Sequence, residues 1–241
     1  MGDTAVIVGG GIGGLAAAIG LRRAGWEVTV VERAPVLDDV GAGISLAANG
    51  LRALDELGVG KAVREASRGQ YSGGTRTPRG GWLARMDGAA LEKAVGTPIM
   101  GIPRATLHRL LREALPPETL LIGSEAGPVR QIDPGTVRVG CGDTVLDADL
   151  VVAADGIGST VRARLFPSHP GPVHSGSTVL RAITEHPVAL RTDFELTWGH
   201  GAEFGHIAFP DGRAEWHAVL SDLPAGTRFA DPLAELRRRF H

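Results

Sequence analysis

The chain of 241 residues contains a single cysteine, Cys141, and so cannot form an internal disulfide bond. This fits a reducing compartment, and we expect a cytoplasmic protein. The sequence also lacks any apolar run near the ~18 residues that a membrane span needs. Basic and acidic residues are almost balanced, 25 against 27, which does not favour nucleic acid or an anionic membrane as a partner.

Several motifs of other enzyme classes are missing as well. The sequence has no phosphate-binding loop ending in Gly-Lys-Ser/Thr, which argues against an ATPase of that type. Ser159 lies outside any Gly-x-Ser-x-Gly motif, so nucleophilic hydrolysis has no support. His200, His206 and His217 lack metal-ligand spacing. We expect strand histidines there, one of which could line a substrate pocket, and no metal site.

Glycine, in contrast, is abundant, with 35 residues, and several follow the first apolar run. Residues 4–8 form a continuous apolar segment typical of a buried parallel strand. Residues 12–24 indicate a helix that Gly25 ends, and residues 27–31 indicate a second strand. Together these segments predict a βαβ unit.

The turn between the first strand and the helix reads Gly9-x-Gly11-x-x-Gly14, and Glu32 ends the second strand. In such a turn the first glycine permits a sharp bend, the second lets a pyrophosphate approach, and the third permits close helix packing. The helix N-terminus offers N–H donors to phosphates, and Glu32 can accept hydrogen bonds from ribose hydroxyls. A glycine-rich chain can produce the bare motif by chance, but here the strand, helix and acid agree. They predict a dinucleotide site without distinguishing FAD from NAD.

Further helices and strands are predicted from caps and apolar runs. Asn49 is expected to cap a helix that ends at Leu57, and Thr106 to cap a helix with leucines on one face. Residues 150–154 form another buried run, and Ser159 is expected to open a short helix.

Two regions have antiparallel character. Residues 67–103 are rich in turns, and segments 204–209 and 214–220 flank a Pro-Asp-Gly turn that predicts a hairpin. A basic helix is expected over residues 233–240.

These patterns predict an α/β fold of two interleaved domains. A Rossmann-like domain with a parallel sheet would comprise residues 1–68 and 104–168. A β-rich, mainly antiparallel substrate domain would comprise residues 69–103 and 170–241.

Two more segments indicate which dinucleotide, FAD or NAD, the fingerprint binds. Residues 41–49 read Gly-Ala-Gly-Ile-Ser-Leu-Ala-Ala-Asn, and residues 149–162 contain the turn Asp155-Gly156 after a buried strand. Together with the fingerprint, they make the sequence resemble the class A flavoprotein monooxygenases, the group of para-hydroxybenzoate and salicylate hydroxylases. The resemblance implies the GR2 type of Rossmann-like fold, with non-covalent FAD.

The resemblance also implies which residues bind the cofactor. Glu32 would hold the adenosine ribose, Arg33 would lie beside the adenine end, and Arg162 would close the Asp-Gly motif. The implied set is Gly9, Gly11, Gly13, Gly14, Glu32, Arg33, Arg104, Ala126, Asp155 and Gly156.

The activity implied is hydroxylation of an aromatic small molecule, phenolic or polyketide-like. NADPH or NADH would reduce FAD, and O₂ would form a flavin C4a-hydroperoxide that transfers one oxygen atom. Because the flavin performs this chemistry, no catalytic acid or base is assigned. A homodimer is compatible with the resemblance.

The sequence departs from the family pattern in one respect. The family's Gly-Asp motif, whose Asp holds the ribityl chain, is absent, so the sequence is expected to match roughly the first two-thirds of such an enzyme. It would then be a truncated chain or a natural short form. Two alternatives to the monooxygenase remain open: an FAD-dependent reductase of the same fold, and a non-catalytic FAD-binding fragment.

Overall fold

The computed structural model describes residues 2–37 and 42–240, so Gly41 of the second glycine motif lies outside the described residues. The chain divides into two compact units. The first unit comprises Met1–Asp39, Leu54–Gly60 and Leu107–Val173, and the second comprises Val40–Ala53, Lys61–Thr106 and His174–His241. Segments 40–53, 61–68 and 104–106 therefore group with the second unit and 170–173 with the first, whereas the predicted bounds placed each in the other domain.

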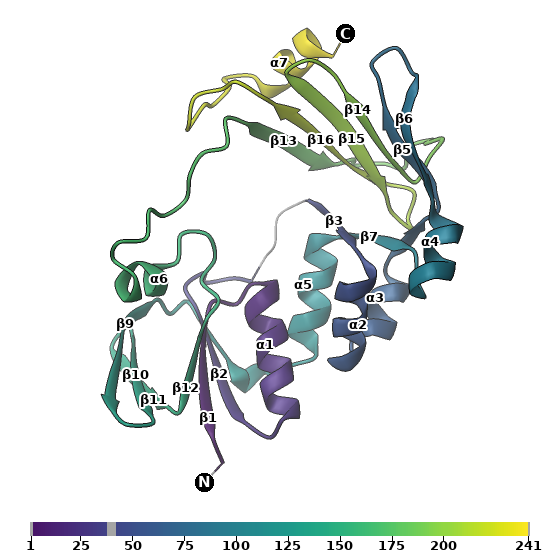
Figure 1. The fold of residues 1–241 in the computed structure, drawn as a ribbon. Helices are drawn as coiled ribbons and strands as arrows, with labels where there is room; N and C mark the ends of the chain where they lie inside the picture. The colour runs from purple at the N-terminus through teal and green to yellow at the C-terminus, as the bar shows by residue number, and fades with distance from the viewer. Residues whose placement is uncertain (1, 38–41, 241) are drawn as a thin grey trace. The chain divides into compact units, whose positions relative to one another are not determined.

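A parallel sheet forms the centre of the first unit (Figure 1). Its strand order is β12 (Leu150–Ala153), β1 (Thr4–Val8), β2 (Glu27–Glu32) and β8 (Leu120–Ile122). Neighbouring strands run parallel throughout. The crossover from β1 to β2 is α1 (Ile12–Arg23), so the predicted βαβ unit is confirmed.

Successive side chains of these strands point to opposite faces of the sheet, and each face is covered by a buried apolar layer. Val6, Val8 and Val31 pack with Val139 and other buried residues of an antiparallel sheet. That sheet contains β9 (Ala126–Asp133), β10 (Thr136–Cys141) and β11 (Thr144–Ala148). Ile7 points to the opposite face because successive side chains of a strand alternate, and α1 packs there. The apolar run of β1 is thus buried on both sides.

The ends of two elements follow the predicted signals. Gly25, just past α1, has φ +91°, the left-handed conformation that ends helices. Ser159 caps α6 (Thr160–Leu165), and its hydroxyl accepts a hydrogen bond of 2.9 Å from the backbone N–H of Arg162. A 3₁₀ turn, η1 (Pro117–Thr119), precedes β8.

Two predicted caps are wrong. The helices α2 (Ala48–Glu56) and α5 (Arg104–Glu113) start before Asn49 and Thr106, which lie in their first turns. At α5 a backbone carbonyl takes the place of a capping side chain. The Ala42 carbonyl accepts a hydrogen bond of 2.8 Å from the Arg104 N–H, which has no partner within the helix.

A six-stranded sheet dominates the second unit (Figure 1). Its order is β13 (Thr178–Ile183), β16 (Ala214–Leu220), β15 (Ala202–Ala208), β14 (Phe194–Trp198), β5 (Ser72–Arg76) and β6 (Trp82–Asp87). The pairs are antiparallel, whereas β14 and β5 run parallel. The predicted hairpin is β15–β16, and Gly212 in its turn has φ +81°.

A smaller antiparallel sheet, three helices and most of α2 complete the second unit. The sheet contains β3 (Gly43–Leu46), β7 (Ile99–Pro103) and β4 (Arg68–Gln70). The helices are α3 (Gly60–Glu65), α4 (Gly88–Val95) and α7 (Pro232–Arg239). The predicted C-terminal helix corresponds to α7, whereas α3 and α4 were not predicted.

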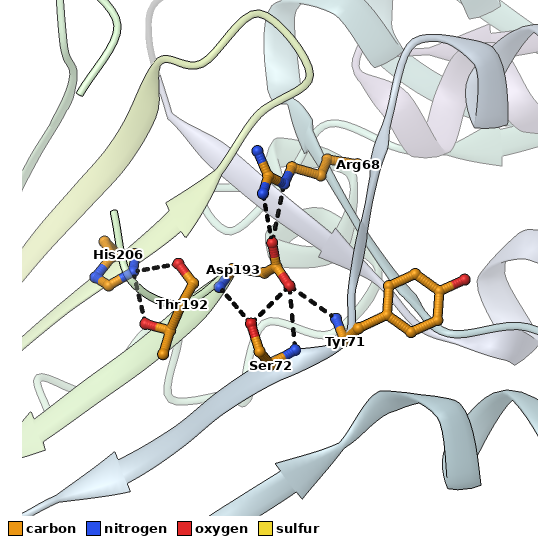
Figure 2. A network of polar contacts seen from close by, with 6 residues as sticks. All are labelled: Arg68, Tyr71, Ser72, Thr192, Asp193 and His206. Atoms are coloured by element: carbon orange, nitrogen blue, oxygen red, sulfur yellow. Dashed lines mark hydrogen bonds and ion pairs between the residues drawn. The ribbon is translucent and has the colours of Figure 1, made fainter. Parts of the chain in front are cut away.

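Asp193, just before β14, joins the parallel strands β14 and β5 through its carboxylate (Figure 2). One oxygen accepts from the Arg68 guanidinium at 3.0 and 2.7 Å. The other accepts from the backbone N–H groups of Tyr71 and Ser72, at 3.1 Å each, and from the Ser72 hydroxyl at 2.9 Å. Burial alone would raise the pKa of Asp193, but hydrogen bonds from Ser72, Arg68 and Tyr71 hold that pKa below its ordinary value.

Candidate cofactor site

The glycine loop after β1 is shaped by close backbone packing. Gly9 has φ +109°, and its N–H donates to the Val31 carbonyl at 2.8 Å. A Cβ at Gly9 would collide with the Ala154 carbonyl, and a Cβ at Gly14 would collide with the Gly9 carbonyl. These contacts explain why glycine is needed at both positions.

Gly11 is different, because no described atom lies within 4 Å of where its Cβ would be. It is the N-cap residue of α1, which starts at Ile12. The Cβ position of Gly13 also has no described atom within 4 Å, but Gly13 does not line the cavity described below. Packing within the described chain therefore gives no reason for glycine at Gly11. The space in front of the helix N-terminus is the kind that a pyrophosphate fills, with free N–H groups and the helix dipole facing it.

Glu32 lies at the end of β2, and its carboxylate is fixed by the backbone. One oxygen accepts from the Gly10 N–H at 2.7 Å, and the other accepts from the Ala34 N–H at 2.8 Å. Each carboxylate oxygen has further lone-pair capacity. Glu32 can therefore hold the glycine loop and still accept hydroxyl groups of a ligand.

His108, in the middle of α5, also holds the glycine loop. Its Nε2 lies 2.7 Å from the Gly10 carbonyl, and the side chain is buried. The carbonyl can only accept, so Nε2 carries the proton in this bond. No sequence motif marks His108, because it lies 98 residues from Gly10 and only the fold brings the two together.

A cavity of about 240 Å³ lies beside this loop in the first unit. It brings together three segments that the sequence analysis selected separately: the glycine loop, the end of β2 and the Asp155-Gly156 turn. Its lining residues are Val8, Gly9, Gly11, Val31, Glu32, Arg33, Glu125, Ala126, Asp155, Gly156, Gly158 and Thr160. Five lining residues were not predicted, although each lies within four residues of a predicted one: Val8, Val31, Glu125, Gly158 and Thr160.

The Asp155-Gly156 turn closes one side of the cavity. Asp155 Oδ2 accepts from the backbone N–H groups of Thr160 at 2.8 Å and Val161 at 3.2 Å, while Oδ1 is buried without a partner among the described residues. Burial alone would raise the pKa of Asp155, but hydrogen bonds from Ser159, Val161 and Thr160 lower it, so the carboxyl stays ionised. An unsatisfied buried acceptor beside a cavity suits a ligand hydroxyl.

The remaining predicted residues lie elsewhere. Gly13 and Gly14 belong to α1 and do not line the cavity. Arg162 donates to the Ile157 carbonyl and braces the Asp-Gly turn. Arg104 belongs to the second unit, at the start of α5; its role toward a cofactor stays a prediction.

Comparison with known families identifies this arrangement. The family model described as "FAD binding domain" matches residues 3–209. The chain belongs to the FAD binding domain family. The glycine loop, Glu32 and the Asp155 turn fit FAD in physical terms as well, since a helix N-terminus suits the pyrophosphate and fixed carboxylates suit hydroxyl groups.

Relatives within the FAD binding domain family are named as hydroxylases and monooxygenases. The chain is 36% identical over 241 residues to aurachin C monooxygenase/isomerase of Stigmatella aurantiaca, covering 99% of this chain and 62% of that protein. It is 31% identical to 3-hydroxybenzoate 6-hydroxylase 1 of Aquipseudomonas alcaligenes, covering 88% of this chain and 56% of the relative. The chain thus spans less than two-thirds of the length of these relatives. The names support the monooxygenase class and do not favour the reductase or fragment alternatives.

Solved structures support the fold assignment. A variant of HpxO from Klebsiella pneumoniae, complexed with FAD, matches with a TM-score of 0.89 and 26% identity. The match covers 99% of this chain and 62% of that one. No helix in the described ranges, 2–37 and 42–240, has the length and apolar character needed to cross a membrane. Within those same ranges no cluster of His, Cys, Asp and Glu could hold a metal ion.

Proposed function

We propose that this chain is the FAD-binding part of a monooxygenase that hydroxylates an aromatic small molecule with NAD(P)H and O₂. The observation that carries the proposal is the cavity shared by the glycine loop, Glu32 and the Asp155-Gly156 turn. A helix N-terminus, an oriented carboxylate and an unsatisfied acceptor meet there, in a chain that belongs to the FAD binding domain family.

Each element has a separate task in this proposal. The N–H groups at the start of α1 bind the pyrophosphate, to which Gly11 allows close approach. Glu32 accepts the adenosine ribose hydroxyls, and Arg33 and Ala126 lie at the adenine end. Asp155 accepts a further hydroxyl group of the cofactor. Gly13 and Gly14 act through α1, and Arg104 stays a predicted FAD-binding residue.

When bound, FAD would supply the redox chemistry. The overall reaction balances as NAD(P)H, a proton, O₂ and an aromatic C–H giving NAD(P)⁺, water and an aromatic C–OH. One oxygen atom enters the ring and the other leaves as water. The residues of this chain bind and orient the cofactor, which explains why no acid–base pair is needed in the cavity.

The relatives indicate the breadth of substrates. Their names include hydroxybenzoate, aminohydroxybenzoate, hydroxynicotinate and quinolone compounds, and these support an aromatic substrate here. One structural neighbour is described as a tetrameric form. A homodimer of this chain stays a prediction.

Exchanging Glu32 for alanine tests the cofactor site. The variant loses charge-assisted hydrogen bonds worth roughly 1.5–3 kcal/mol each, so we expect FAD affinity to fall at least tenfold in a fluorescence titration. Glu27→Gln is the matched control, because Glu27 is an exposed acid at the other end of β2. Equal FAD affinity of Glu32→Ala and the wild type would disprove the role of Glu32.

Product analysis tests the reaction. The protein is incubated with FAD, NADPH or NADH, O₂ and a panel of phenols, and hydroxylated product and hydrogen peroxide are measured together. Hydroxylated product formed with NAD(P)H consumption supports a monooxygenase. FAD reduction without any oxygenated product, in a protein that contains the whole coding sequence, would contradict the proposal and favour a reductase.

A further inference from the structure

The six-stranded sheet of the second unit carries a polar group that the cofactor site does not use. Glu215, in β16, is only 3% exposed, yet it has an ionisable side chain. Its carboxylate accepts a hydrogen bond of 3.0 Å from Nδ1 of His217. Burying a carboxylate is costly unless it is paired, so Glu215 requires His217 as its partner and fixes the orientation of that ring.

Strand register shows which residues share the face with this pair. In the β13–β16–β15–β14 part of the sheet, residues paired across strands point to the same side. One row across these strands contains Arg181, His217, Gly205 and Leu196. The adjacent row contains Val179, Val219, Glu203 and Trp198. We call these eight residues the His217 face.

One end of this side of the sheet is covered within the second unit. A Cβ at Gly43 of β3 would lie 2.8 Å from Cβ of Glu215, and one at Gly101 of β7 would lie 2.7 Å from Ile207. The His217 face lies beyond this covered end, and on it Val179 and Trp198 are 49% and 51% exposed. The face ends at Trp198 beside a hollow of about 550 Å³.

His217 is held in a defined orientation. Nδ1 donates to Glu215, and the ring lies over Gly205, where a Cβ would come within 2.5 Å of Nε2. The distance from Nε2 to Glu203 is 3.9 Å, too long for a hydrogen bond. When the ring is protonated, Nε2 also carries a hydrogen and is positioned to donate it to a ligand, with apolar Leu196 on the other side of Gly205.

The charges near His217 indicate which ligand fits. His217 and Arg181 are the basic groups, and Glu203 and Glu215 are the acidic groups facing them. The hydrogen bond to Glu215 raises the pKa of His217, although burial lowers it, and Glu203 raises it further whereas Arg181 lowers it. Because acids and bases balance, the face offers no net positive charge to a carboxylate.

We propose that the His217 face binds the aromatic substrate, with Nε2 of His217 donating to a ring oxygen and with preference for an uncharged ring over a benzoate. This proposal rests on the proposed monooxygenase function. The apolar residues pack against the ring, and Glu203 disfavours a carboxylate close to His217.

The test compares two probes that differ in charge, 3-hydroxybenzamide and 3-hydroxybenzoate. Binding to the FAD-saturated protein is measured by ligand-observed NMR, which requires no turnover. We expect 3-hydroxybenzamide to bind more tightly, and its affinity to fall about tenfold in His217→Gln, as expected for loss of a charge-assisted hydrogen bond. Binding should weaken as the pH rises through the pKa of His217.

Further variants separate binding from folding. His217→Gln leaves Glu215 without its charged partner, so Glu215→Gln/His217→Gln is measured alongside. Gly205→Ala displaces the His217 ring without changing any charge, and should weaken binding to a similar extent. His206→Gln is the control. His206 follows Gly205 in β15, so its side chain points to the opposite side of the sheet from the His217 face. Thermal melts verify that each variant is folded.

Tighter binding of 3-hydroxybenzoate, or equal binding by folded Gly205→Ala and wild type, would overturn the proposal. Failure of both probes to bind would also overturn it. If His217→Gln then weakened self-association, the His217 face would be an interface between two copies of the chain. None of these outcomes affects FAD affinity, so failure here is distinct from failure of the proposed function.

Discussion

Gly11, Gly13 and Gly14, at the start of α1, have different surroundings, so an added Cβ would have a different effect at each. Gly14 is required by its contact with the Gly9 carbonyl, whereas Gly11 and Gly13 have no described atom near their Cβ positions. Gly11 lines the cavity and Gly13 does not. If FAD occupies this cavity, a side chain at Gly11 would collide with the cofactor, whereas a side chain at Gly14 would collide with the protein backbone.

Alanine variants at these positions should separate the two effects. Gly14→Ala should destabilise the protein by about 1–3 kcal/mol through overpacking. Gly11→Ala should keep the wild-type Tm without FAD but bind FAD at least tenfold more weakly. Gly13→Ala is the control, and its FAD affinity should stay near wild type, with a gain of up to about 1 kcal/mol in helix stability. Thermal melts with and without FAD measure both effects, and normal FAD affinity in Gly11→Ala would contradict the assigned site.

His108 gives a second prediction for the same loop. His108→Leu leaves the Gly10 carbonyl without its partner, so we expect a loss of about 1–3 kcal/mol in stability and weaker FAD binding. His108→Gln retains an N–H donor and should recover most of both. If His108→Leu and His108→Gln behave alike, the loss comes from packing of α5 and not from the hydrogen bond to Gly10.

Residues adjacent to a motif were easier to predict than residues brought in by the fold. Seven of the ten predicted cofactor residues line a common cavity, because the fingerprint and the Asp-Gly turn follow β1 and β12, which are neighbouring parallel strands. His108 has no local signal. It lies on a regular helix, and its contact with Gly10 depends on how α5 packs.

At the scale of elements, the misplaced and missed helices have local physical causes. Asn49 and Thr106 are good capping residues, but α2 and α5 begin earlier, so neither residue acts as a cap. The helix α4 was detectable: Asp87 accepts from the Ala90 N–H at 2.9 Å, and Gly96 ends the helix with φ +88°. The many turn residues within 67–103 favoured a prediction of short antiparallel strands over the whole segment, and no helix was predicted there.

The junction of β5 and β14 should respond to acid through Asp193. Its folded-state pKa is lowered, so its contribution to stability is complete above the ordinary Asp pKa of about 3.9 and is lost as the pH falls through the folded pKa. Asp193→Asn should therefore cost about 2 kcal/mol or more at neutral pH and show a smaller further loss in acid. Urea unfolding at several pH values measures this, with Asp143→Asn in an exposed turn as control. An unchanged pH slope in Asp193→Asn would contradict this assignment.

At the scale of the whole molecule, two ligands can show which residues bind each half of the cofactor. ADP contains the adenosine and pyrophosphate of FAD but no flavin. We expect both ADP and FAD to slow amide exchange at residues 9–14, 32–34 and 155–160. Arg104 is predicted to be one of the binders of the adenosine and pyrophosphate half, so both ligands should protect it as well. Protection of Arg104 by FAD alone would assign it to the flavin half instead, and protection by neither ligand would contradict its prediction as a cofactor residue.

The strand pairing of both units also determines the order in which they can fold. The central strand β1 pairs with β12, and β5 pairs with β14, so each partner lies more than a hundred residues away in sequence. Closing such long loops is entropically unfavourable until many contacts form together. During synthesis, β1 and β5 must therefore wait for later segments with one edge unpaired, while the β15–β16 hairpin can form as soon as it emerges. Folding of this chain is thus expected to be slow, because the central pairing of each unit joins segments that are far apart in sequence.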